Sequence, residues 1–149
     1  MATAAARAPE RRSIGRSILA VFVGFVVVFV LSLGTDQALH VLGVYPPWGA
    51  PMYERELNLL ALAYRFIYTV LGGWLVARLA PGAPMKHVMI FAAIGLVFGL
   101  LGVAGAMAMS PRLGPLWYPI GVAITGPIGA WAGGVLYTRR RRQPAAGSW

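Results

Sequence analysis

The sequence predicts an all-α, polytopic membrane protein in which four transmembrane helices form one bundle with both termini in the cytoplasm. The first observation is composition: the 149-residue chain is 58% hydrophobic and only 11% charged. The second is patterning, because the apolar residues gather into four long stretches, at residues 18–34, 57–77, 88–109 and 116–138. In lipid, backbone polar groups must be satisfied within their own segment, so such stretches become helices of about 20 residues.

The third observation is the placement of the basic residues that give the chain its net charge of +9. Ten of them fall in the two tails and the middle connection: Arg7, Arg11, Arg12, Arg16, Arg78, Lys86, Arg139, Arg140, Arg141 and Arg142. The other two connections hold only Arg55 and Arg112. The positive-inside rule therefore predicts cytoplasmic termini and a cytoplasmic connection at residues 80–87. This pattern favours membrane topology over nucleic-acid binding as the reason for the charge.

The first helix is predicted at about residues 14–42, after a disordered basic tail at residues 1–13. A cleaved signal peptide is the alternative, since Arg11 and Arg12 resemble a twin-arginine signal and residues 32–34 resemble a cleavage site. The apolar run is long for a signal peptide, which favours retention as a membrane helix.

The second helix is predicted at about residues 54–79, and it follows a connection with three prolines that cannot be helical. Tyr45 and Trp48 in this connection suit the outer headgroup level. The third and fourth helices are predicted at about residues 86–109 and 116–138. Trp117 and Tyr118 are predicted at the same outer interface.

Two features of the fourth helix carry separate predictions. Pro127 removes an N–H near the centre of the helix, so we expect a kink there. The tail at residues 139–149 begins with Arg139, Arg140, Arg141 and Arg142, which we expect to contact anionic lipid.

Glycines at small-residue spacing mark the third and fourth helices, namely Gly95, Gly99, Gly102, Gly129 and Gly133. Small residues let helices approach closely in lipid. We expect the two helices to pack on each other through these glycines within one chain, with an oligomer interface as the alternative.

Two charged residues lie inside predicted spans, where an unpaired charge costs several kcal/mol. Asp36 lies about 9 Å and Arg65 about 12 Å from the outer boundary, at 1.5 Å per residue. We therefore expect them to meet. His40, Ser32 and Tyr68 share the faces that carry these charges, which predicts a polar seam between the first two helices.

Three interpretations of this seam are open. The first interpretation is an ion pair that fixes helix register. The second is a proton or ion pathway through Asp36, Arg65 and His40. The third is a metal site formed by Asp36, His40 and Glu54 or Glu56. The spacing favours the first and is not diagnostic of a metal. The chain has no cysteine, and no catalytic motif or cofactor site is recognised.

Six short segments resemble a family of small, uncharacterised bacterial four-helix integral membrane proteins. They are TDQALH at 35–40, GVYPPWG at 43–49, AYR at 63–65, ARLAP at 77–81, PMKH at 84–87 and WYP at 117–119. The resemblance covers roughly residues 14–138 in order. It implies a bacterial inner-membrane protein and no mechanism.

The sequence thus predicts a non-enzymatic accessory or structural subunit of a larger membrane assembly. Its expected partners are membrane lipids and either another membrane protein or further copies of itself, with no nucleic acid. A small oligomeric transporter or ion-pathway component is the alternative, and it would use the polar seam.

Overall fold

The computed structural model describes residues 11–142 as four long helices packed in one bundle. They are α1 (Arg11–Val41), α2 (Arg55–Leu79), α3 (Pro84–Ala108) and α4 (Trp117–Arg142). All four are long and apolar enough to cross a membrane. The chain is therefore a small four-helix integral membrane protein, as predicted.

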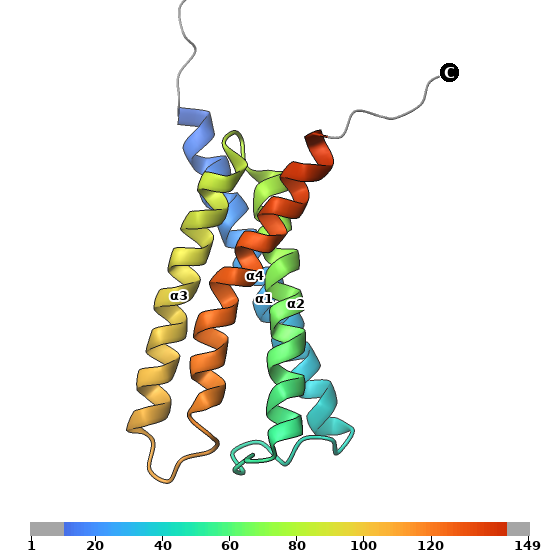
Figure 1. The fold of residues 1–149 in the computed structure, drawn as a ribbon, viewed down its shortest axis with the longest axis vertical. Coiled ribbons are helices and arrows are strands. Elements are labelled where there is room, and N and C mark those ends of the chain that lie inside the picture. Colours follow the sequence, from blue (N-terminus) through green and yellow to red (C-terminus); the bar gives the residue numbers. More distant parts are fainter. Residues whose placement is uncertain (1–10, 143–149) are drawn as a thin grey trace, which may run out of the picture.

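The helices alternate in direction, so the connections fall at two ends of the bundle (Figure 1). The start of α1, the α2–α3 connection and the end of α4 lie together at one end. This basic end carries Arg78, Lys86 and the arginines of α4. The α1–α2 and α3–α4 connections lie at the opposite, aromatic end with Tyr45, Trp48 and Trp117.

Three helix boundaries differ from the prediction by two residues or more. α1 begins at Arg11, within the predicted tail, whose residues 1–10 lie outside the described part of the chain. α3 begins at Pro84, because proline is well tolerated in a first helical turn. α4 continues through Arg139–Arg142, since arginine is a good helix former and a cation is favourable at a helix C-terminus.

Packing is uneven among the four helices. α2 lies against α4 and α1, and α3 packs chiefly on α4. In the described residues α1 does not pack against α4. Many large apolar side chains of α1 are accordingly exposed, among them Phe22, Phe29 and Val30, and the bundle is open on one side.

An apolar cluster fills the half of the bundle near the basic end. Its buried members come from all four helices: Val21, Val76, Ala77, Val88, Phe91, Ala92 and Ala130. A second cluster, near the aromatic end, centres on Tyr45, Ala61 and Tyr64. The two halves therefore differ in chemistry, with polar groups concentrated in the second.

The predicted glycine packing is partly wrong. Gly129 and Gly133 lie against α2, where a Cβ at Gly133 would collide with the Val70 carbonyl and one at Gly129 would sit 3.2 Å from the Phe66 carbonyl oxygen. On the α2 side of this contact lies Gly73, where an added Cβ would collide with the Ala130 carbonyl. The close seam is thus between α2 and α4, because glycines from both helices meet there.

The predicted α3–α4 contact does exist, but with different partners. A Cβ at Gly99 would lie 2.9 Å from Ala123 Cα of α4. At Gly95 the nearest atom is Phe25 of α1 at 4.0 Å, and at Gly102 nothing lies within 4 Å. Of the three α3 glycines predicted to pack against α4, only Gly99 therefore serves the α3–α4 interface.

α4 remains helical through Pro127. Figure 1 shows its axis changing direction near the middle of the helix, in agreement with the predicted kink. Thr125 Oγ1 donates to the Gly121 carbonyl at 2.8 Å. The hydroxyl two residues before the proline thus bonds the backbone carbonyl one turn before its own position, as expected for such a bend.

Candidate functional site

The predicted contact between Asp36 and Arg65 is present. Arg65 Nη2 donates to Asp36 Oδ2 at 2.6 Å, joining α2 to α1. The Asp36 side chain is 13% exposed and the Arg65 side chain 25%, so protein atoms cover most of both charged groups. Opposite charges at this distance offset much of the cost of placing each in a low-dielectric interior.

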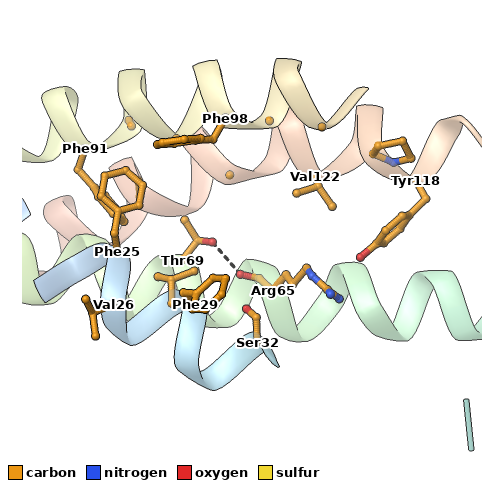
Figure 2. Close-up of a pocket in the computed structure, with 18 residues that line it drawn as sticks. Phe25, Val26, Phe29, Ser32, Arg65, Thr69, Phe91, Phe98, Tyr118 and Val122 are labelled. Atoms are coloured by element: carbon orange, nitrogen blue, oxygen red, sulfur yellow. Dashed lines mark hydrogen bonds between the residues drawn. The ribbon is translucent and has the colours of Figure 1, made fainter. Parts of the chain in front are cut away.

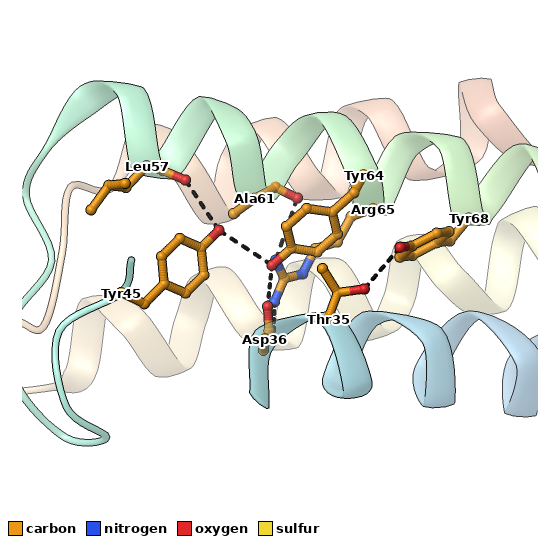
Figure 3. A network of polar contacts seen from close by, with 8 residues as sticks. All are labelled: Thr35, Asp36, Tyr45, Leu57, Ala61, Tyr64, Arg65 and Tyr68. Atoms are coloured by element: carbon orange, nitrogen blue, oxygen red, sulfur yellow. Dashed lines mark hydrogen bonds and ion pairs between the residues drawn. The ribbon is translucent and has the colours of Figure 1, made fainter. Parts of the chain in front are cut away.

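Tyr64 completes this pair from the position next to Arg65 (Figure 3). Its hydroxyl donates to Asp36 Oδ1 and accepts a hydrogen bond from Arg65 Nη1 at 2.9 Å. The Arg65 guanidinium also lies 5.1 Å from the centroid of the Tyr64 ring. One tyrosine therefore bonds both members of the ion pair.

Tyr45 reaches the same network from the α1–α2 connection rather than from a helix. Its hydroxyl donates to the Leu57 carbonyl at 3.3 Å and lies 3.4 Å from the Tyr64 hydroxyl. Tyr45 was predicted as an interfacial anchor, but it is only 5% exposed. Burial raises the pKa of its hydroxyl, which favours the protonated, donating form.

The local backbone explains how Tyr45 turns inward. The N–H groups of Val44 and Tyr45 both donate to the Leu39 carbonyl at the end of α1. Gly43 sits between them and the helix with φ of 69°, a left-handed conformation that glycine adopts without steric cost. The chain therefore folds back over α1 immediately after the helix ends.

Two further hydrogen bonds extend the polar contacts toward the bundle centre. Thr35 Oγ1 and the Tyr68 hydroxyl lie 2.8 Å apart across the α1–α2 interface. Thr69 Oγ1 donates to the Arg65 carbonyl at 2.7 Å. The predicted seam between α1 and α2 thus includes Tyr68, and Thr35 is the partner that the sequence did not identify.

His40 does not join this network by a hydrogen bond. Its Nδ1 bonds the Pro46 carbonyl, and its ring centroid lies 4.0 Å from that of Trp48. Trp48 in turn donates to Gln37 Oε1 at 3.0 Å. His40 therefore holds the α1–α2 connection and meets the network through a ring contact with Tyr45, at 5.5 Å between centroids, because the chain folds back at residues 43–45 and supplies other hydrogen-bond partners.

Ser32 also lies apart from the ion pair, in the wall of a large cavity (Figure 2). The cavity has a volume of about 830 Å³ and is lined by residues from all four helices. Arg65 and Tyr118 line it too, and the guanidinium lies 5.8 Å from the centroid of the Tyr118 ring. Tyr118 thus faces Arg65, although the sequence predicted a place at the outer interface.

The remaining predicted positions lie at the two ends of the bundle. Trp48 and Trp117 are 58% and 39% exposed at the aromatic end, which fits interfacial anchors. The four arginines of α4 are exposed at the basic end. Among the described residues, Asp36, His40 and Glu54 or Glu56 do not form a three-ligand metal group.

Comparison with protein-family models, with curated proteins and with solved structures gave no match. The fold and the polar network are therefore the structural evidence that bears on function. They establish a multi-pass membrane protein whose helices contact lipid and whose intramembrane charges are paired internally.

Proposed function

We propose that this protein is a non-enzymatic accessory or structural subunit of a larger membrane assembly in a bacterial inner membrane. Three features support the proposal. The connections between the helices are short, the intramembrane polar groups described above bond chiefly to one another, and the resemblance noted in the sequence is to bacterial membrane proteins. In this interpretation the protein acts through its membrane-facing surface, with lipids and other membrane proteins as its partners.

The observation that carries this proposal is an uncovered small-residue surface on α3. A Cβ built at Gly105 meets nothing within 4 Å, and Ala108, a small residue on the same helical face, is exposed. The larger Leu101 borders these two residues and is exposed as well. Glycine in a helix costs roughly 1 kcal/mol relative to alanine in water, so an unused glycine has no benefit to the isolated fold. Small residues on a lipid-facing surface favour close approach of another transmembrane helix.

The test is the assembly size of the full chain extracted from its native membrane in a mild detergent. A partner helix on this surface predicts that Gly105→Leu releases the chain from a larger complex. Gly15→Leu is the matched control, because a Cβ at Gly15 also meets nothing within 4 Å, but Gly15 lies near the start of α1 and hence at the basic end. A wild-type chain that runs as a monomer, or equal effects of both variants, would contradict the proposal.

A second candidate is an oligomeric transporter or ion-pathway component built on the polar seam. The position of Arg65 in a cavity wall favours it. The apolar cluster between this network and the basic end opposes it, because ions need polar or hydrated surroundings across the whole membrane. Ion flux through vesicles containing the purified protein, abolished by Asp36→Asn with Arg65→Gln, would favour this candidate over the first.

A further inference from the structure

The cavity lies where α1 and α4 fail to meet. Phe25, Phe29 and Ser32 of α1 line one side, and residues of α3 and α4 line the other (Figure 2). Its volume of about 830 Å³ falls in the range of roughly 300–1,000 Å³ that small ligands occupy. Since the lining is predominantly apolar, the cavity suits a molecule that enters from the bilayer.

One part of this cavity is polar and offers hydrogen-bond donors: the guanidinium of Arg65, which only donates, and two hydroxyls, which donate or accept. Arg65 uses Nη1 and Nη2 in the network described above, while its Nε makes no hydrogen bond to the described residues. The hydroxyls of Ser32 and Tyr118 likewise make none within the described part of the chain. Figure 2 shows Ser32, the Arg65 guanidinium and the Tyr118 hydroxyl on the same side of the cavity. Donors left unmatched in an apolar medium favour a ligand that brings an acceptor.

Charge and depth restrict what that acceptor can be. The positive charge of Arg65 is already balanced by Asp36 at 2.6 Å, so an anionic ligand would bring an unpaired charge into the membrane. Arg65 lies ten residues after the first residue of α2, or about 15 Å along the helix. A phospholipid headgroup would have to leave the interface to reach it. A neutral carbonyl oxygen on a freely diffusing lipophile satisfies both restrictions.

The rest of the lining suits a planar ring and a long apolar tail. The Tyr118 ring stands beside the polar groups. Farther along, Phe25 lies 4.5 Å from Phe91 and 6.1 Å from Phe98, measured between ring centroids. Aromatic side chains stack favourably on flat rings and add apolar contact area.

We propose that this cavity binds a long-chain quinone. One quinone carbonyl accepts hydrogen bonds from Tyr118 and Arg65, and the isoprenoid or alkyl tail runs past Phe25 and Phe98. The proposal concerns binding alone and includes no electron transfer. It is independent of the partner surface around Gly105, which lies outside the cavity lining.

The experiment uses the full chain in nanodiscs of neutral phosphatidylcholine and radiolabelled decylubiquinone as the probe. We expect saturable binding that unlabelled decylubiquinone displaces. Decylbenzene has a ring and the same alkyl tail but no carbonyl, and it should compete poorly. Tyr118→Phe keeps the ring and removes the hydroxyl, so it should weaken binding by about three- to tenfold, the effect of one hydrogen bond.

A pair of glycine variants separates occupation of the cavity from damage to the fold. Gly126 lines the cavity and a Cβ there meets nothing within 4 Å, so Gly126→Leu should fill the space and reduce binding more than tenfold. Gly105→Leu is the matched control and should leave binding unchanged while releasing any protein partner. Circular dichroism and size-exclusion profiles check that both variants fold.

Three results would overturn the quinone proposal. They are absence of saturable binding to the folded wild-type chain, equal competition by decylbenzene, and unchanged affinity in both Tyr118→Phe and Gly126→Leu. Equal competition would mean that the cavity accepts any apolar chain. None of these results would alter the partner proposal, which rests on complex size and Gly105.

Discussion

The Arg65 guanidinium contacts the Asp36 carboxylate and the Tyr64 hydroxyl at the same time, with N–O distances of 2.6 Å and 2.9 Å. Tyr64 also donates to the other Asp36 oxygen. The three side chains therefore form one closed unit between α1 and α2. Such a unit fixes the register of the two helices, because a shift of either helix along its axis would separate the charges.

The first prediction is that Asp36→Asn and Arg65→Gln each destabilise the protein strongly. Each change leaves the opposite charge without its partner, which for buried ion pairs costs about 3–5 kcal/mol. The double variant should recover much of this loss, since it contains no unpaired charge. The measurement is the free energy of unfolding in detergent for all four members of the cycle.

Additivity decides whether the two residues act as a pair. Coupled residues give a double variant much more stable than the sum of the single losses predicts. If the two losses simply add, the ion pair contributes nothing to stability in the membrane environment.

The second prediction concerns the tyrosine hydroxyls of the network. Tyr64→Phe removes hydrogen bonds to two charged groups and should cost about 1.5–3 kcal/mol. Tyr45→Phe removes a bond to the neutral Leu57 carbonyl and should cost about 0.5–1.5 kcal/mol. Tyr53→Phe, at an exposed position, is the matched control and should change stability little. A larger loss for Tyr45→Phe than for Tyr64→Phe would contradict the central place of Tyr64.

The third prediction concerns the glycines at the α2–α4 interface. A methyl group at Gly133 would collide with the Val70 backbone, so Gly133→Ala should cost at least about 1–3 kcal/mol through overpacking. Gly73→Ala should behave similarly against Ala130. Gly102→Ala adds a methyl group where nothing lies within 4 Å and should be neutral or slightly stabilising. Thermal unfolding in detergent compares the three variants, and equal stabilities would show that the interface relaxes around the added methyl group.

Hydropathy was sufficient to predict the four helices, because lipid requires each span to satisfy its own backbone. Depth arithmetic likewise predicted that Asp36 and Arg65 meet, since adjacent antiparallel helices share a boundary. Both arguments use only distance along the chain. They succeed because the bilayer has a fixed thickness, so distance along a helix gives the depth of each residue in the membrane.

Rotation of each helix about its axis was harder to predict. The spacing of Gly129 and Gly133 shows that they share a face, but it does not say which neighbour that face meets. The inward turn of Tyr45 depends on the positive φ of Gly43 and on two bonds to the Leu39 carbonyl. The cavity exists because α1 does not reach α4. No residue pattern within either helix alone predicts that the two helices stay apart.

The last prediction is the topology. Both chain termini and the connection at residues 80–87 should face the cytoplasm, because short loops rich in lysine and arginine are retained on that side. The chain has no cysteine, so single-cysteine variants report one position each. Gly82→Cys lies at the basic end, while Ala50→Cys and Leu113→Cys lie in the two connections at the aromatic end. In intact bacterial cells, a membrane-impermeant maleimide should label positions 50 and 113, and position 82 should react only after the membrane is permeabilised.

Met52 N–H donates to the Leu113 carbonyl at 2.7 Å, so the two outer connections are joined and must lie on the same side. Labelling of position 82 in intact cells would reverse the orientation, and labelling of position 50 without 113 in a folded variant would contradict the contact between the connections.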